Sequence, residues 1–375
     1  MYDSAAVRAA AEFAQTKLAP IAAELDEEGR APVELFEEMA RLGFFGMRYP
    51  KELGGGGLSA TESYLAVAEL AKASAGVALL VEVHWMAVDA ILKFGSEEQK
   101  ARWLPDLLTG RRIAAYTVSE AQAGSDAAGI ATAAKKTEGG YVLNGAKYFS
   151  TNGGVADLYV IAAKTDPEAG GRGISMFAVD IDSPGMRISP NIQKLGCRSS
   201  EMTALSFKDC FVPEENLIGA ENGGFKVAMY GLVGGRVGMA AMGLGIAAAA
   251  LDSAASYANR RRAFGAPLAK IPAVQTMIAE MHVKTETVRH MLLAVTGKMD
   301  RGEDVSVESS TAKLAAAEAV SEVCHKALQI HGGHGYLKGN AAERYFRDGR
   351  LMDIGVGSSE VLKSVVGGSV LRSYQ

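Results

Sequence analysis

The chain has 375 residues, 48% of them hydrophobic, with a formal net charge of −4 and a sequence pI near 6.0. This length and composition allow two or three domains with a large core. The acidic balance and the lack of a polybasic segment exclude nucleic acid as the partner. The three cysteines, Cys197, Cys210 and Cys324, lie far apart without metal-ligand spacing. We therefore expect reduced core thiols, and neither a disulfide framework nor a metal site.

The first residues do not have the pattern of a targeting signal. Arg8 and Glu12 interrupt the N-terminal segment, so no apolar signal region is expected and the predicted localisation is cytoplasmic. Two apolar stretches, 76–93 and 237–251, are similar to membrane spans in composition. The first contains Glu82, His84 and Asp89, and the second is short and rich in Ala and Gly. We therefore expect no membrane partner.

Residues 4–110 show a helical pattern, with apolar residues recurring at three and four positions. The pattern predicts an N-terminal helical domain over residues 1–112. Gly54–Gly57 is expected to be a linker, because it lacks the Lys-Ser/Thr pair of a phosphate-binding loop. Helices are predicted at 61–73 and 77–93, and the second is apolar nearly all round, so it should be buried.

After Arg112 the period approaches 2, and a middle β domain is predicted over residues 113–220. Glycine-containing dipeptides supply the positive φ angles that tight turns require. The predicted strands cover 142–145, 158–163, 174–181 and 205–212. The predicted turns are Gly139-Gly140, Asn144-Gly145, Asn152-Gly153 and Pro184-Gly185.

The helical period returns after Gly219, which predicts a C-terminal helical bundle over residues 221–375. Its first helix is rich in Ala and Gly, which lets neighbouring backbones approach, so oligomer contacts are expected there. The four long helices are predicted near 224–261, 273–300, 307–331 and 341–371. The predicted fold class is therefore α+β, with an N-terminal helical domain, a middle β-barrel or sandwich domain and a C-terminal four-helix bundle.

Residues 116–126 read Tyr-Thr-Val-Ser-Glu-Ala-Gln-Ala-Gly-Ser-Asp, a strand that runs into a small-residue loop. The hydroxyls and backbone N–H groups of this loop suit a flat polar ring. Four further motifs follow at 147–154, 261–265, 329–336 and 344–348. In this order and spacing, the motifs resemble those of the acyl-CoA dehydrogenase family over essentially the whole chain.

The resemblance implies an oxidoreductase that acts on CH–CH bonds of an acyl-CoA thioester, with FAD as cofactor. It also implies electron-transferring flavoprotein as a partner, and commonly a homotetramer in which one subunit's bundle covers its neighbour's cofactor. By matching positions, the implied cofactor contacts are Tyr116, Val118, Ser119, Gly124, Ser125, Phe149, Thr151, Arg261, Gln329, Gly332, Gly333, Ser358 and Glu360. The implied substrate contacts are Ser125, Val233, Gly234, Gly235, Arg236, Val356 and Gly357.

Two places in the chain depart from the family pattern of cofactor contacts. Phe149 stands where the family often has a tryptophan, and Ile271-Pro272 replaces a glutamine that contacts the adenine end of FAD. Proline has no N–H to donate, so the cofactor or subunit contact there is expected to differ.

The proton acceptor is the main departure. Family members commonly use a glutamate just before a Gly-Thr/Ser pair, which here is Gly357-Ser358, but the residue before it is Val356. A smaller group places the glutamate before the arginine that here is Arg236, where this chain has Gly235. Both usual positions therefore lack a carboxylate. A positioned general base contributes on the order of 10² to 10⁴ in rate, so a dehydrogenase without a replacement base would be slow.

Glu82 is the leading replacement candidate. It lies among apolar residues of the helix at 77–93, which matches the helix that borders the acyl cavity in the family. Burial there would raise its pKa toward a useful range. Two other roles stay open for Glu82, namely binding a polar group of the substrate or serving as a structural acid. His84, Asp353 and Glu360 rank lower as acceptors, and His84 is expected to be a hydrogen-bonded core residue.

Several other polar residues have structural interpretations. Asp89 shares a helix face with Glu82, but its spacing to Lys93 predicts an exposed ion pair. The run 260–262 of three arginines is typical of a solvated helix end. His331 and His334 flank a Gly-Gly pair and are expected to be turn residues, because no further ligand has metal-binding spacing.

Three functions remain open from the sequence. The first is a variant dehydrogenase that oxidises an unsaturated, cyclic or polar acyl-CoA with a relocated base. The second is a redox-neutral lyase similar to the sulfinopropionyl-CoA desulfinases, and the third is a non-catalytic FAD-binding subunit of a heteromeric dehydrogenase. The intact loop at 116–126 favours an active enzyme.

Overall fold

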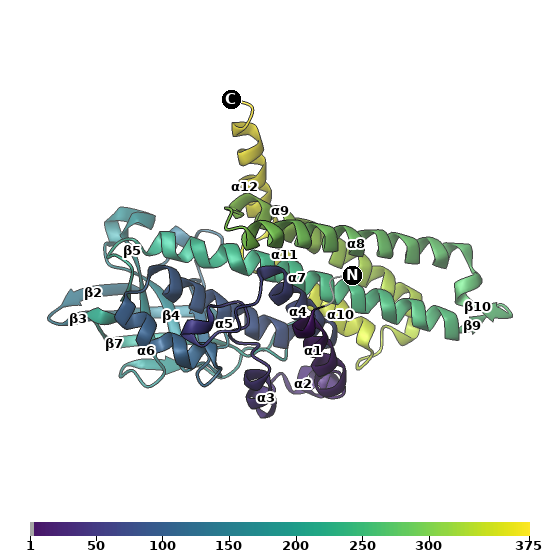
Figure 1. Ribbon diagram of the computed structural model, residues 1–375, viewed down its shortest axis with the longest axis horizontal. Helices are drawn as coiled ribbons and strands as arrows, with labels where there is room; N and C mark the ends of the chain where they lie inside the picture. Colours follow the sequence, from purple (N-terminus) through teal and green to yellow (C-terminus); the bar gives the residue numbers. More distant parts are fainter. Residues whose placement is uncertain (1–3) are drawn as a thin grey trace.

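The structure is a computed structural model that describes residues 4–375. The chain forms an elongated molecule with the β domain at one end, the long helices of the bundle along its length, and the N-terminal helices packed beside both (Figure 1). The N-terminal helices are α1 (Ala5–Phe13), α2 (Ala22–Glu28), α3 (Phe36–Arg41), α4 (Ala60–Ala73), α5 (Ala75–Phe94) and α6 (Glu97–Leu108).

Serine caps set the starts of the helices that border the site. Ser59 and Glu62 form a reciprocal capping box at α4, and the Ser74 hydroxyl accepts from Val77 N–H at the start of α5. The helices predicted at 61–73 and 77–93 are thereby confirmed. Helix α5 is buried on nearly all sides, as its apolar composition predicts.

The β domain is a mixed sheet with strand order β6-β7-β3-β2-β4-β5-β8, and β1 pairs in parallel with β4. Alternate residues of β4 enter two cores, one shared with the helices and one enclosed by the sheet itself. The strands are β1 (Ala114–Thr117), β2 (Ala133–Thr137), β3 (Gly140–Thr151), β4 (Leu158–Lys164), β5 (Ile174–Asp180), β6 (Met186–Ile188), β7 (Met202–Pro213) and β8 (Leu217–Ile218).

The predicted turn at Asn144-Gly145 is wrong. Strand β3 continues through it, and the register with β7 shifts between Leu143 and Gly145, which marks a β-bulge. A Cβ at Gly145 would lie 2.7 Å from Thr132 Cα, so glycine serves a close backbone approach. The other predicted turns contain residues with positive φ, at Gly139, Asn152 and Gly185.

The C-terminal domain contains α7 (Gly224–Arg260), the hairpin strands β9 (Arg262–Ala263) and β10 (Ala266–Pro267), α8 (Pro272–Asp300) and α9 (Ser306–His331). The single helix predicted at 341–371 is wrong. It is broken into α10 (Ala341–Gly349), α11 (Leu351–Ile354) and α12 (Ser359–Arg372). The last break falls at Gly355–Ser358, and α12 projects away from the rest of the molecule (Figure 1).

Helices α5 and α7 are long and apolar enough to cross a membrane, but most of their side chains are buried inside the protein. They pack against each other through a row of glycines on α7. The bundle also contacts the first domain through Arg347, whose Nη2 donates to Asp26 Oδ2 at 2.6 Å. These contacts hold the three domains around the region where β1, α5 and α7 meet.

Candidate active site

The loop after β1 is tied to β3 by a buried ion pair. Lys147 Nζ donates to Glu120 Oε1 at 2.8 Å and to the Val118 carbonyl at 3.0 Å. Glu120 also accepts from the backbone N–H groups of Ala131 and Thr132. Burial alone would raise the pKa of Glu120, but the charge and hydrogen bonds of Lys147 lower it to about 2. The Glu120–Lys147 ion pair therefore holds the loop in one conformation, with both charges paired.

The same contacts bring two predicted cofactor segments together. Tyr148 N–H donates to the Ser119 carbonyl at 3.0 Å, so Phe149 and Thr151 on β3 lie beside the loop. Phe149 has φ 60° and its ring is 53% exposed, although most large apolar side chains in this domain are buried. An exposed ring held on a strained backbone suits stacking against a flat ligand.

The loop fits a flavin. Gly124 and Ser125 are exposed, and within residues 4–375 their backbone N–H groups have no acceptor. A Cβ at Gly124 would meet nothing within 4 Å, so the space above the loop is open. Ser119 is partly exposed beside Val118. The Tyr116 hydroxyl, by contrast, donates to the Ala228 carbonyl of α7 at 2.9 Å, so this side chain also anchors β1 to the bundle.

The two positions at which the resemblance leads us to expect a glutamate, Gly235 and Val356, lie next to each other in this chain. A Cβ at Gly235 would lie 3.0 Å from Val356 Cγ1 and 2.9 Å from Met86 Sδ. The space that an acid at either position would occupy is therefore lined by apolar groups. Val233 and Gly234 belong to the same stretch of α7, and the Tyr64 hydroxyl donates to the Gly234 carbonyl at 3.2 Å.

Glu82 lies one turn further along the same interface. It is 3% exposed, and a Cβ at Gly238 would lie 1.7 Å from its Oε2, so only glycine leaves room for the carboxylate. Within the described part of the chain neither carboxylate oxygen has a hydrogen-bond partner. Burial raises the pKa of Glu82 to about 8, with Arg48 opposing the shift and Asp89 adding to it.

The competing acceptors are occupied elsewhere. His84 accepts from Ala114 N–H at Nδ1 and contacts the Leu107 carbonyl through Nε2 at 3.1 Å, so its role as a core residue is confirmed. Burial lowers its pKa to about 4. Asp353 is bonded to Ser321, Ser359 and Arg350. Glu360 is exposed on the first turn of α12.

The prediction that Asp89 forms an exposed pair with Lys93 is wrong. Asp89 is turned inward, its side chain is 12% exposed, and its Oδ2 accepts from Arg48 Nη2 at 2.5 Å. Arg48 lies in the segment between α3 and α4, so tertiary contact supplies a stronger partner than the helix neighbour. The sequence analysis did not identify Arg48 as a site residue, because nothing in the local pattern at 48 indicates what it meets.

The segment around Val356 is strained. Val356 has φ 54° and Gly357 has φ 97°, and positive φ is a genuine outlier for a β-branched residue. Lys313 Nζ donates to the Gly357 carbonyl at 2.8 Å and holds the turn in place. Arg236 is half-buried, its Nη1 donates to Ser310 Oγ at 3.3 Å, and burial lowers the pKa of its guanidinium. The Ser358 hydroxyl accepts from Val361 N–H and caps α12.

The remaining predicted cofactor residues lie at the other end of α7. Arg261, Gln329, Gly332 and Gly333 are exposed where α7 and α9 end. His331 joins these ends, because its Nε2 is 3.3 Å from Ser253 Oγ and its ring stacks on Tyr257. Within one subunit this cluster does not meet the loop after β1. Among residues 4–375 no group of three His, Cys, Asp or Glu side chains is placed to hold a metal ion.

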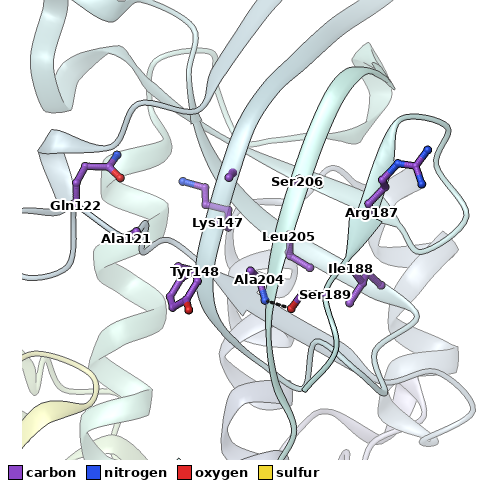
Figure 2. A pocket seen from close by; sticks show the side chains of 11 residues that line it. Ala121, Gln122, Lys147, Tyr148, Arg187, Ile188, Ser189, Ala204, Leu205 and Ser206 are labelled. Carbon is purple, nitrogen blue, oxygen red and sulfur yellow. Dashed lines mark hydrogen bonds between the residues drawn. The ribbon is translucent and has the colours of Figure 1, made fainter. Parts of the chain in front are cut away.

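A shallow cavity of about 450 Å³ lies beside the loop, on the face formed by β3, β6 and β7 (Figure 2). Arg187 is the exposed charged group on its rim, and Ser189 Oγ accepts from Ala204 N–H at 2.9 Å across it. Its lining contains no carboxylate and does not include Glu82 or Val356. The cavity therefore does not contain the proton acceptor.

Sequence profiles of the N-terminal, middle and C-terminal domains of acyl-CoA dehydrogenases match residues 3–111, 115–210 and 222–371. The chain belongs to the acyl-CoA dehydrogenase family. The predicted fold class is confirmed, as are FAD as cofactor and an oxidoreductase that acts on CH–CH donors.

Three relatives are similar to this acyl-CoA dehydrogenase in sequence or structure over nearly the whole chain. The mouse (Mus musculus) mitochondrial short-chain specific acyl-CoA dehydrogenase is 40% identical over 97% of this chain and 89% of its own length. The acryloyl-CoA reductase (NADH) of Anaerotignum propionicum is 40% identical over 97% of this chain and 93% of its own length. The structure of butyryl-CoA dehydrogenase from Megasphaera elsdenii superposes with a TM-score of 0.96 at 38% identity, covering 98% of this chain and 97% of that chain.

Proposed function

We propose that this acyl-CoA dehydrogenase uses Glu82 as the proton acceptor and oxidises an unsaturated, cyclic or polar acyl-CoA. The observation that carries the proposal is the buried Glu82 carboxylate at the α5–α7 interface, next to Val356; neither of its oxygens has a hydrogen-bond partner among residues 4–375. Burying an unpartnered carboxylate costs free energy, so a structural acid would be expected to have hydrogen bonds. A substrate could donate a proton to these free carboxylate oxygens.

The displaced position of Glu82 supports a substrate of different shape from a straight saturated chain. Gly238 lies three residues beyond Gly235 on α7, a rise of about 4.5 Å. Glu82 faces Gly238, whereas the position of Val356 faces Gly235. A base moved by this distance would favour a carbon further from the thioester, or the same carbon in a ring or branched group.

The proton and electron balance is that of a dehydrogenation. Glu82 in its ionised form takes a proton from one substrate carbon and becomes neutral, while a carbon–carbon double bond forms. Bound FAD would accept the hydride that leaves the other carbon, and an electron acceptor would reoxidise it. Ser119, Ser125 and the N–H groups of the loop would hold the flavin, and the apolar wall of Met86 and Val356 would exclude water.

Single-turnover reduction of the flavin by substrate tests the proposal. Glu82→Gln should keep bound FAD but reduce it at least on the order of 10²-fold more slowly. Glu69→Gln, a partly exposed glutamate on α4 paired with Lys72, is the control and should keep the wild-type rate. An unchanged rate in Glu82→Gln would remove Glu82 from the reaction. Substrate conversion with the flavin oxidised at the end would indicate the redox-neutral lyase.

The substrate panel should include saturated, unsaturated, cyclic and polar acyl-CoAs. The proposal expects reduction by members of the last three classes and slow reduction by straight saturated chains. Electron transfer is then measured with electron-transferring flavoprotein or a dye as acceptor. Flavin that stays oxidised with every thioester, and is reduced only after a second chain is added, would indicate the non-catalytic subunit.

We also infer that FAD is shared between subunits of a homo-oligomer. Arg261 follows Ala228, where Tyr116 contacts α7, by 33 residues of mostly helix, a rise of about 50 Å. The two cofactor-binding clusters of one chain are therefore too far apart to hold the same FAD. Arg261→Ala should lower FAD content without changing the loop after β1, and sedimentation should show an oligomer. A monomer that binds FAD normally would contradict this inference.

A further inference from the structure

A second ionic group lies behind Glu82, and the proposed reaction does not by itself use it. The Arg48 side chain is 12% exposed, and its Nη2 donates to Asp89 Oδ2 at 2.5 Å. Its Cζ lies 4.8 Å from the centre of the Tyr49 ring, 5.1 Å from Trp85 and 5.5 Å from Tyr64. Burial lowers the pKa of Arg48, but Asp89 together with Tyr49, Tyr64 and Glu82 more than offsets this, so the pKa stays well above the ordinary value. Arg48 is therefore a permanent cation inside an aromatic cage.

The cage is held rigidly. The Tyr49 hydroxyl lies 3.0 Å from both Asp89 Oδ1 and the Trp85 carbonyl. Trp85 Nε1–H donates to the carbonyls of Phe44 and Phe45. Within the part of the chain that the structure describes, Arg48 Nε has no acceptor, so the guanidinium keeps unused hydrogen-bonding capacity.

The glycines of α7 show where this cage lies relative to Glu82. A Cβ at Gly234 would lie 2.8 Å from Asp89 Oδ2 and 3.6 Å from Arg48 Nη2. A Cβ at Gly238 would lie 1.7 Å from Glu82 Oε2. The two glycines are four residues apart on one helix, a rise of about 6 Å, so the cation and the carboxylate lie against successive turns of α7. Gly235 lies on the same face, since a Cβ there would lie 2.9 Å from Met86 Sδ of α5.

We propose that Arg48 and Asp89 are positioning residues for Glu82. The charge of Arg48 favours the ionised Glu82 carboxylate, which is the form that accepts a proton. Asp89 weakens this effect, because it pairs with Arg48 and carries the opposite charge. This inference rests on the function proposed above. A cation one helical turn from a buried carboxylate favours the ionised form of that carboxylate. An unpaired cation, by contrast, would bind the carboxylate and remove it from the substrate. The ion pair with Asp89 prevents that collapse.

The charges that face the group from every side agree with this arrangement. Arg48 comes from the segment before α4, Tyr64 from α4 and Asp89 from α5, while Tyr116 of β1 and Tyr230 of α7 border Asp89. The tyrosines are neutral, because burial raises their pKa values. Arg48 and Asp89 are thus the charged groups that act on Glu82, and their signs are opposite.

The test compares Asp89→Asn with Arg48→Met in the FAD-bound enzyme. The pH at which flavin reduction reaches half its maximal rate should fall by about one unit in Asp89→Asn and rise by about one unit in Arg48→Met. Infrared spectroscopy of the enzyme without substrate gives a second readout. The band of the protonated carboxyl, assigned by its absence in Glu82→Gln, should titrate with the same opposite displacements. Arg48→Lys should restore a midpoint close to that of the wild type.

The outcomes distinguish a positioning role of Arg48 and Asp89 from a purely structural one. Opposite displacements in both readouts support the inference. Displacements of the same sign, or none, would overturn it and leave Arg48–Asp89 as a structural ion pair. If Arg48→Met does not fold, the double variant Arg48→Met/Asp89→Asn removes both charges, and a midpoint below or equal to that of the wild type would overturn the role of Arg48. If Glu82→Gln reduces its flavin normally, the proposed function fails, whereas the infrared titration still judges the effect of the ion pair.

Discussion

Two carboxylates in this enzyme are equally hidden from solvent and differ in almost everything else. Glu82 and Glu120 are each 3% exposed. Glu120 accepts hydrogen bonds from Lys147, Gln122 and two backbone N–H groups, and its pKa falls to about 2. Glu82 has no partner among the described residues, and its pKa rises to about 8. Burial alone therefore does not decide ionisation, because the groups placed around the carboxylate do.

The two carboxylates also differ in their roles. The Glu120 ion pair shapes the loop that fits the flavin and leaves no acceptor capacity unused. Glu82 is retained at a cost in folding free energy, which is typical of a group kept for chemistry.

The largest expected effect tests the cost of Glu82 directly. Its pKa of about 8 exceeds the value of 4.5 for an unperturbed glutamate, so the folded state holds a proton that the unfolded state has lost between these pH values. Stability due to this group is therefore lost as pH rises from about 4.5 to about 8, by roughly 5 kcal/mol in all. Glu82→Gln should remove this loss, measured as the free energy of unfolding by urea at pH 5, 7 and 9. Equal pH profiles of the two proteins would contradict the assignment.

The next largest effect is expected when the ion pair between Lys147 and Glu120 is removed. Lys147→Met leaves Glu120 charged and buried without its partner, which should cost about 3–5 kcal/mol of stability and weaken FAD binding. The double variant Lys147→Met/Glu120→Leu should recover much of the stability. Chemical denaturation and FAD titration measure both quantities. A loss below about 1 kcal/mol in the single variant would show that the pair does not hold the loop.

A second carboxylate beside Glu82 should shift its titration. Val356→Glu places a like charge one helical turn away along the interface, so the pH midpoint of flavin reduction should rise by about one unit. Val356→Gln is the uncharged control and should leave the midpoint in place. Val356→Glu should also gain activity with straight saturated acyl-CoAs if the cavity keeps its family shape. No gain across a panel of such thioesters would indicate a remodelled cavity.

The smallest expected effect on stability comes from Gly238→Ala. The added Cβ would occupy the position of the Glu82 carboxylate, which must rotate away. The helix propensity of alanine offsets part of the strain, so stability should change by less than about 1 kcal/mol. Flavin reduction should nevertheless slow at least about tenfold, since the base is displaced. An unchanged rate would mean that the carboxylate acts from another position.

The sequence predicted much of the local structure and part of the site. Helices α4 and α5 follow from serine caps and apolar patterns, and His84 was recognised as a core residue. Asn144-Gly145 was misjudged, because a dipeptide that favours a turn also favours a bulge when a neighbouring strand approaches closely. The long C-terminal helix was misjudged because helical periodicity continues on both sides of Gly355–Ser358, where Lys313 of another helix fixes the break.

The amino-acid sequence by itself determined the three-domain order, the small-residue loop at 116–126 and the absence of a carboxylate at positions 235 and 356, because each depends on residue type and on order along the chain. Only the tertiary structure decided that Asp89 faces inward to Arg48, that Glu120 forms an ion pair with Lys147, and that Glu82 stands opposite a glycine without a hydrogen-bond partner among residues 4–375. Ionisation depends on charges and donors within a few ångströms, and those come from segments far apart in sequence.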